Sequence, residues 1–243
     1  MVGAEAAADA VARARRLPEL RVGLHLVLVD GRPVLPIGKV PGLVRGDEFD
    51  RNLVRAGVRF FGIPRVRQEL AREIRDQFEA FRATGLPLDH VNAHKHMQLH
   101  PTVTALIIEI GRDYGMRAVR VPSEPVEILR RAFPEERYRG PAYRPWIQAL
   151  RRRLKGAGLI INDHVFGLAW SGGLVEERLL GLLPYLPEGV SEIYFHPAST
   201  PCPHLSAAMP GYRHCEELAA LLSPRVRRLI DQSTIRLASY AEL

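Results

Sequence analysis

One stretch decides how the rest of the chain is read: residues 88–101, LDHVNAHKHMQLHP. If its backbone is extended, the side chains of His90, Asn92, His94 and His96 point to one side, because strand side chains alternate with period two. Neutral imidazole is a common ligand of zinc and similar metals, and two histidines at i and i+2 at a strand end can converge on one ion. The alternative for each histidine is an ordinary hydrogen bond in the core or at the surface. The clustering favours a metal or catalytic site.

Working outward from this stretch, apolar periodicity predicts an alternation of helices and strands. Helices are expected at 4–17, 47–60, 64–83 and 102–114, and strands at 21–29, in the histidine-rich stretch, and at 116–121, 158–163, 191–195 and 234–238. Histidines lie in or directly after several of these strands: His25, His164 and His196. Such an order indicates an α/β fold with a parallel sheet, and polar residues at strand ends are typical of a β/α barrel.

The composition fits one globular domain over residues 1–243, with 47% hydrophobic residues. The formal net charge is +7, yet only Lys39, Lys95 and Lys155 are lysines and the arginines are spread along the chain, with no nucleic-acid-binding signature. Two cysteines, Cys202 and Cys215, form no disulfide framework, so a reducing cytoplasm is expected. No apolar run is long enough to span a membrane.

A basic, aromatic insertion is predicted at about 126–157. Arginines alternate there with Phe133, Tyr138, Tyr143 and Trp146. This composition suits a peripheral contact with anionic lipid at the inner membrane. The alternative, a pair of surface helices that pack these rings on the domain, is slightly favoured.

Three separated motifs carry a resemblance to a known family: Gly23-Leu24-His25-Leu26, the histidine-rich stretch from Asp89 to Pro101, and Tyr194-Phe195-His196-Pro197. Their order resembles that of the YdjC-like (chitooligosaccharide deacetylase-like) carbohydrate deacetylases. Over nearly the whole chain, the closer resemblance is to the branch associated with hopanoid biosynthesis, HpnK.

The resemblance implies a polysaccharide-deacetylase-like β/α barrel, a divalent metal (Mg²⁺ or Zn²⁺), and hydrolysis of an N-acetyl group on an amino sugar, in this branch one linked to a lipid. His25 resembles one metal ligand and His94 the second, with His96 as the alternative for that place. His196 resembles the catalytic imidazole that protonates the leaving amine. Asp89, Asn92 and Asp163 are candidates for orienting the ligands. A homodimer is an open alternative to a monomer.

The chain departs from the family at its start. Members open with a strand that ends in an Asp-Asp-Phe-Gly motif, which supplies a third ligand and the base, whereas the first Asp here is Asp9, inside a helix pattern. We therefore expect a barrel that is incomplete at the N-terminus. Asp30 and Asp163 are candidates to replace the missing carboxylate, although their spacing in the sequence does not favour them. Two other functions stay open: another barrel metallohydrolase such as a phosphoesterase, and a non-catalytic, inactive remnant.

Overall fold

The structure is a computed structural model that describes residues 1–138, 144–201, 205 and 209–243. Contacts between residues divide it into two compact units. Unit 1 comprises Met1–Arg120, Gln148–Ile161 and Ser239–Leu243, and unit 2 comprises Val121–Ile147 and Asn162–Ala238. The single domain expected from the sequence stays a prediction.

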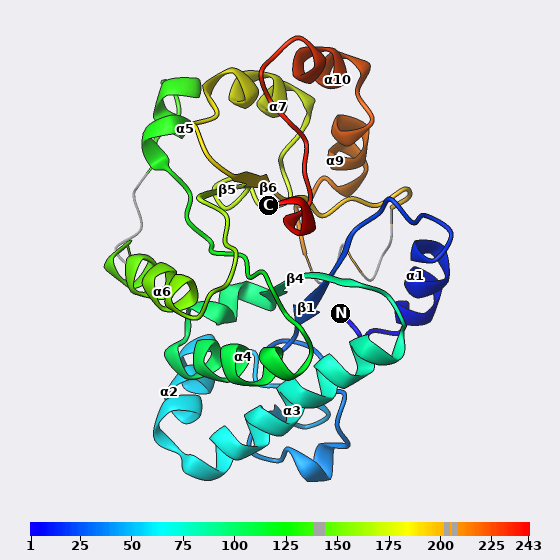
Figure 1. Cartoon of the computed structure of the whole chain (residues 1–243), viewed down its shortest axis with the longest axis vertical. Coiled ribbons are helices and arrows are strands. Elements are labelled where there is room, and N and C mark those ends of the chain that lie inside the picture. Colours follow the sequence, from blue (N-terminus) through cyan, green and yellow to red (C-terminus); the bar gives the residue numbers. More distant parts are fainter. Residues whose placement is uncertain (139–143, 202–204, 206–208) are drawn as a thin grey trace. The chain divides into compact units, whose positions relative to one another are not determined.

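Unit 1 is built on parallel strands covered by helices (Figure 1). Its helices and strands are α1 (Ala7–Ala14), β1 (Val22–Leu26), η1 (Ile37–Lys39), β2 (Val44–Arg45), β3 (Glu48–Phe49), α2 (Leu53–Gly62), α3 (Pro64–Ala83), β4 (Leu88–Ala93), η2 (His94–Leu99), α4 (Pro101–Asp113) and η4 (Tyr240–Glu242). The last residues of α6 (Arg144–Gly156), from Gln148 on, also belong to it.

The sheet of unit 1 starts at strand β1. Strand β1 pairs with β4 in parallel, with His25 opposite Asn92 and Leu26 opposite Ala93. Parallel bridges then join Val91 to Val119 and Ala118 to Ile160. Successive segments therefore run in one direction, as the alternation of strand and helix patterns predicts.

Helix α3 has the bounds that its apolar spacing predicts, and it packs on β1, α2 and α4. It also buries a polar row that sequence periodicity does not anticipate. Glu73 accepts the amides of Val34 (2.9 Å) and Leu35 (3.1 Å), and Gln77 bonds both the N–H and the C=O of Val27 (2.9 and 2.7 Å). These bonds satisfy backbone groups of the loop that follows β1, which would otherwise be buried without partners.

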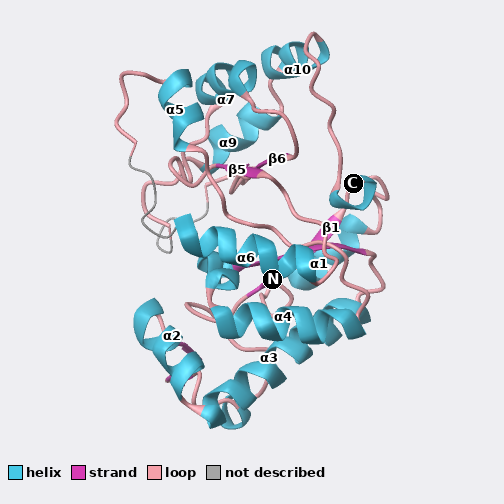
Figure 2. Cartoon of the chain, turned by 60° about the vertical axis from the view of Figure 1, so that its left-hand side comes forward, coloured by secondary structure: helices cyan, strands magenta, loops and turns pink. Residues whose placement is uncertain are grey.

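Unit 2 contains α5 (Val126–Ala132), β5 (His164–Phe166), α7 (Glu176–Leu182), η3 (Leu183–Tyr185), β6 (Ser191–Ile193), α9 (His214–Leu221) and α10 (Pro224–Asp231), shown by type in Figure 2. Strands β5 and β6 are parallel, with His164 opposite Ser191. Its core gathers Phe166, Trp170 and Leu174 with leucines of α7.

Two aromatic residues of the insertion, Phe133 and Tyr138, follow the packing alternative. Phe133 and Tyr138 lie edge-on to the buried Trp170, with ring centres 5.0 and 5.9 Å away. Trp146 is about half exposed, at 51%, and Tyr143 lies outside the described residues.

Several expectations about elements are wrong. The strands expected at 116–121 and 158–163 are reduced to isolated bridges at Ala118, Val119 and Ile160, and a short strand forms instead at His164–Phe166. Residues 234–238 form no strand, because nearly all of them are exposed and so lack the alternating burial that a strand in a sheet has. The helix expected from residue 47 begins only at Leu53, because Gly46 adopts a positive φ of 70° and turns the chain into the β2–β3 hairpin. The described strands form two-stranded sheets and no closed sheet, so barrel closure stays a prediction.

Candidate functional site

The histidine-rich stretch is extended only as far as Ala93. Beyond it η2 begins, and Lys95 and His96 adopt left-handed backbone conformations with φ of 49° and 54°. The idea that His94 and His96 continue the alternation of the strand is therefore wrong. Left-handed φ is costly for residues other than glycine, and such residues often mark functional sites.

The structure brings His25 and His94 together. Their ring centres are 5.7 Å apart, with the rings edge-on at 71°. Two imidazoles bound to one tetrahedral ion at about 2.1 Å would have ring centres roughly 5 Å apart, so this spacing is close to that of a shared ion. Burial lowers the pKa of His25 to about 3, against a smaller opposing effect of its bond to Asn92, so its ring is neutral at pH 7.

The side chain of Asn92 contacts the ring of His25. The side-chain amide of Asn92 lies 2.5 Å from Nδ1 of His25. Turned so that its nitrogen faces His25, it also accepts from both terminal nitrogens of Arg120, at 3.2 Å. In this orientation Nδ1 of His25 is the acceptor and Nε2 carries the proton.

A metal bound at Nε2 of His25 requires the opposite tautomer. The amide of Asn92 would then have to turn, so that its oxygen accepts from Nδ1–H and the Nε2 lone pair is exposed. Asn92 thus contacts this candidate ligand in either orientation, and its role in orienting a metal ligand stays a prediction.

The imidazole pair fits a borderline metal such as Zn²⁺ as part of a donor set. Protein zinc sites take three or four ligands, and the described residues contain no group of three His, Cys, Asp or Glu side chains placed to hold an ion. His25 and His94 alone thus do not complete a metal site.

An ion pair joins Lys95, the residue after His94, to Asp30 in the loop that follows β1. The Nζ of Lys95 donates to a carboxylate oxygen of Asp30, and Arg51 lies 3.5 Å from the other oxygen. This hydrogen bond from Lys95, with the charges of Lys95, His94 and Arg51, lowers the pKa of Asp30. Asp30 also has a positive φ, of 47°. In the described part of the chain, the only non-glycine residues with such a φ are Asp30, Lys95 and His96, all in this loop or in η2.

The other two acidic candidates have structural partners. Asp89 accepts from His90 (2.8 Å) and from the backbone of Ala241 (3.0 Å). In unit 2, Asp163 accepts from the amide of Val190 at 3.1 Å.

His196 lies in unit 2, directly after the strand region of β6. Its ring is edge-on to Tyr194 and Tyr212, with centres 5.5 and 5.1 Å away. Its amide donates to the fully buried Glu217 at 2.5 Å, and its carbonyl accepts from Nδ1 of His214 at 2.5 Å. The backbone of His196 is thus fixed on both sides.

Sequence reasoning missed several of these residues. Arg120 and Tyr212 carry no local signal, because each acquires its role through a partner distant in sequence. The left-handed Lys95 was equally hidden, since lysine has no preference for that conformation.

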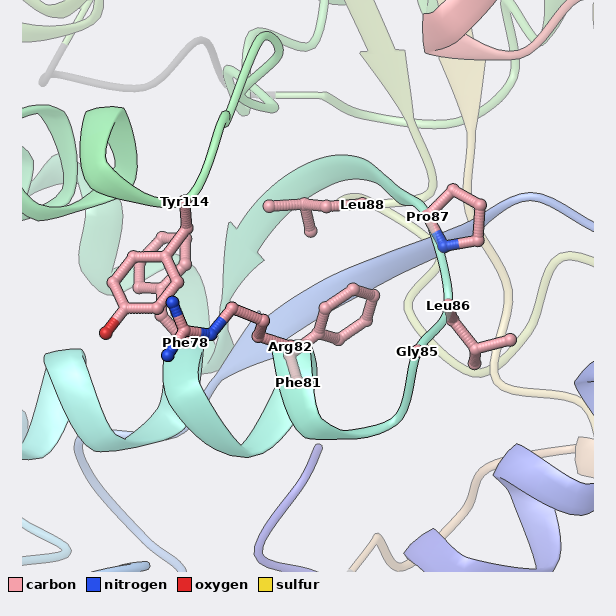
Figure 3. Close-up of a pocket in the computed structure, with 8 residues that line it drawn as sticks. All are labelled: Phe78, Phe81, Arg82, Gly85, Leu86, Pro87, Leu88 and Tyr114. Atoms are coloured by element: carbon pink, nitrogen blue, oxygen red, sulfur yellow. The ribbon is translucent and has the colours of Figure 1, made fainter.

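A cavity of about 330 Å³ opens elsewhere in unit 1 (Figure 3). Phe78, Phe81 and Arg82 of α3 line it with Leu88 and Tyr114. Leu88 begins β4, whereas His94 follows the last residue of that strand. The cavity therefore lies at the opposite end of β4 from the histidine pair.

The protein thus has an α/β fold in which the parallel strands β1 and β4 bring His25 and His94 together near their carboxyl ends, as a candidate metal site. Comparison with known proteins gives its family: the family model for YdjC-like proteins matches residues 1–232, and the chain belongs to this family.

Two similar relatives are named carbohydrate deacetylases. The one from Geobacillus stearothermophilus is 28% identical and the one from Brevibacillus brevis 25%; both alignments cover 100% of this chain, and 84% and 86% of the relatives. Among solved structures, a candidate cellobiose-phosphate cleavage protein from Enterococcus faecalis matches with a TM-score of 0.74 at 20% identity, over 99% of this chain and 85% of that one. This likeness supports the fold alone.

Proposed function

We propose that the chain is a carbohydrate deacetylase that hydrolyses the N-acetyl group of an amino sugar. The observation that carries the proposal is the close pair of His25 and His94 beside Asn92, in a chain whose relatives are named for this activity. Hydrolysis joins a water oxygen to the acetyl carbon and breaks the C–N bond, and the nitrogen takes a proton to leave as an amine.

We assign His25 and His94 as two ligands of a divalent metal, Mg²⁺ or Zn²⁺, with His96 as the alternative to His94. Such an ion, when bound, polarises the acetyl carbonyl and lowers the pKa of water. The neutral state of His25 supports this role, because only an unprotonated imidazole binds metal.

His196 is assigned as the imidazole that protonates the leaving nitrogen. Its fixed backbone and its place between two tyrosine rings support a positioned side chain. A pKa near neutrality is what suits imidazole to proton transfer.

The finer assignment is a polysaccharide-deacetylase-like barrel of the hopanoid-associated branch, with a glycosylated lipid as substrate. It rests on the motif resemblance. A lipid-linked substrate would place the enzyme in the cytoplasm at the inner membrane. Within the described residues, no helix is long and apolar enough to cross a bilayer.

The test is acetate release from N-acetylglucosaminyl substrates, free and lipid-linked, with added Mg²⁺ or Zn²⁺. We expect release by the wild type and loss of at least a hundred-fold in His25→Ala, His94→Ala and His196→Ala. His100→Gln is the matched control, because His100 lies in the same stretch but bonds the carbonyl of Gly57 at 3.0 Å. Unchanged release in the three alanine variants would refute the site, and phosphate release from sugar phosphates instead would favour a phosphoesterase.

A further inference from the structure

Helix α2 exposes an apolar row on its outer side. Val54, Val58 and Phe61 are 77%, 67% and 74% exposed. Their spacing of four and then three residues puts them on one face of the helix. A different face, with Ala56 and Phe60, is buried in unit 1. The helix therefore has one apolar face for the core and a second that nothing in the described chain covers.

In the sequence, arginines surround this row without any acidic residue among them. Between residues 51 and 67 the chain has five arginines and no Asp or Glu: Arg51, Arg55, Arg59, Arg65 and Arg67. Three of them pair with carboxylates outside this segment. In the part of the chain that the structure describes, Arg59 and Arg67 take part in no ion pair.

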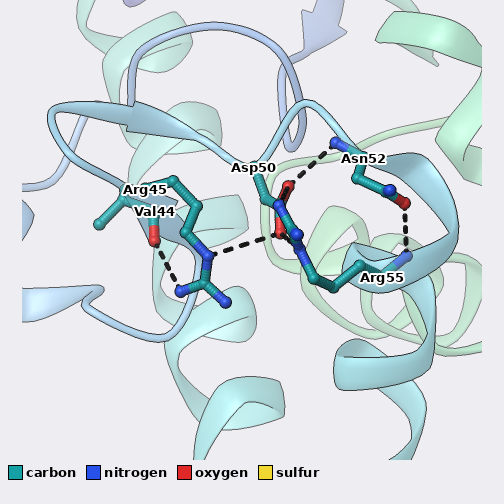
Figure 4. A network of polar contacts seen from close by, with 5 residues as sticks. All are labelled: Val44, Arg45, Asp50, Asn52 and Arg55. Carbon is teal, nitrogen blue, oxygen red and sulfur yellow. Dashed lines mark hydrogen bonds and ion pairs between the residues drawn. The ribbon is translucent and has the colours of Figure 1, made fainter.

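The row is held rigidly. Arg55 donates to both oxygens of the buried Asp50 (2.6 and 2.7 Å), and Asn52 caps the helix by accepting the amide of Arg55 at 2.9 Å (Figure 4). From the other side, His100 bonds the Gly57 carbonyl and lies edge-on to Phe60. In Figure 2, α2 lies at the outer edge of unit 1.

We propose that this face of α2, with Val54, Val58 and Phe61 between arginines, docks on an anionic membrane surface. Apolar side chains that enter the headgroup region beside cations are the signature of an interfacial helix. The charges favour this occupant over a second copy of the chain, because two such faces in contact would bring the same arginines together. Three side chains that are each at least two-thirds exposed suit insertion between headgroups.

The inference goes beyond the chemistry of the proposed function and rests on it only for its purpose, access to a lipid-linked substrate. Its test uses no substrate, so the docking surface and the deacetylase assignment can fail separately.

The full chain is sedimented with vesicles of phosphatidylcholine alone or mixed in equal parts with phosphatidylglycerol. We expect binding to the mixed vesicles that weakens with added salt. The variant Val54→Ser/Val58→Ser/Phe61→Ser should bind at least ten-fold more weakly. The matched control Leu221→Ser/Leu222→Ser/Leu237→Ser removes three exposed leucines of unit 2 and should bind like the wild type.

Two further variants keep the test independent of folding. Arg59→Glu/Arg67→Glu should weaken binding while the apolar row is intact, and Phe61→Trp should show a blue-shifted emission that appears only with anionic vesicles. Wild-type protein that stays in solution, or a serine variant that binds equally well, would overturn the proposal. So would a wild-type dimer that the serine substitutions dissociate and that does not bind vesicles.

Discussion

The substitution Asp50→Asn tests how the start of α2 is stabilised. The carboxylate of Asp50 is 1% exposed and accepts two bonds from Arg55 and one from the amide of Asn52 at 2.9 Å. The bond from Arg55 is the largest of the effects that lower its pKa, from 3.8 to about 2. Asparagine keeps the shape of the side chain but removes its charge.

The pKa shift gives the size of the effect. The drop in this pKa from 3.8 to about 2 corresponds to at most ~2.5 kcal/mol, and because the Arg55 side chain is half exposed we expect ~1–2 kcal/mol at pH 7. For a chain of this length that lowers the melting temperature by roughly 5 °C. Since the folded pKa lies below the unfolded one, the contribution is full above about pH 4 and is lost as the pH falls toward 2.

The assay is urea unfolding of both proteins at a series of pH values from 7 down to 3. The difference in unfolding free energy should be constant above pH 5 and shrink below pH 4. The matched control is Asp9→Asn, which removes the exposed pair with Arg13 and should leave the urea midpoint unchanged. A difference that stays constant down to pH 3, or none at pH 7, would refute the reasoning.

Three other predictions concern the candidate site. Lys95→Ala should be less stable than Lys95→Gly by about 1 kcal/mol in urea unfolding. Both variants lose the ion pair with Asp30, but a φ of 49° is strained for alanine and not for glycine. The reverse order of stability would contradict this backbone strain. Glu217→Ala should cost about 3 kcal/mol in thermal unfolding, since the amides of Leu174 and His196 lose a buried acceptor. Asn92→Leu should lower the metal affinity measured by calorimetry at least ten-fold. Asn92→Asp should retain the affinity, because its carboxylate fixes the Nδ1–H tautomer of His25. Equal affinities of the two variants would show that Asn92 does not orient His25 as a ligand.

The sequence predicted those elements whose burial follows from their own pattern of apolar residues. Helix α3 has a strong apolar period and begins at Pro64, so its bounds were readable, and Leu24 and Leu26 alternate with His25 in β1 as expected. The pairing of His25 with Asn92 depends on the register of β1 and β4, which local sequence does not encode.

The failures have a common physical cause. Residues 234–238 have the composition of a strand but no burial to support one, and the alternation beyond Ala93 ends where tertiary contacts hold two left-handed residues. The Asp30–Lys95 pair joins residues 65 positions apart, so only the fold brings it together.

The measurement that tests the central claim most directly is simultaneous quantification of acetate and free amine from an N-acetylglucosaminyl substrate, before and after metal removal. We expect the two products to form in equal amounts. A chelator should stop both, Zn²⁺ or Mg²⁺ should restore both, and His94→Ala should produce neither. Acetate formation that persists with chelator and in His94→Ala, or no formation by the metal-supplied wild type, would contradict this claim.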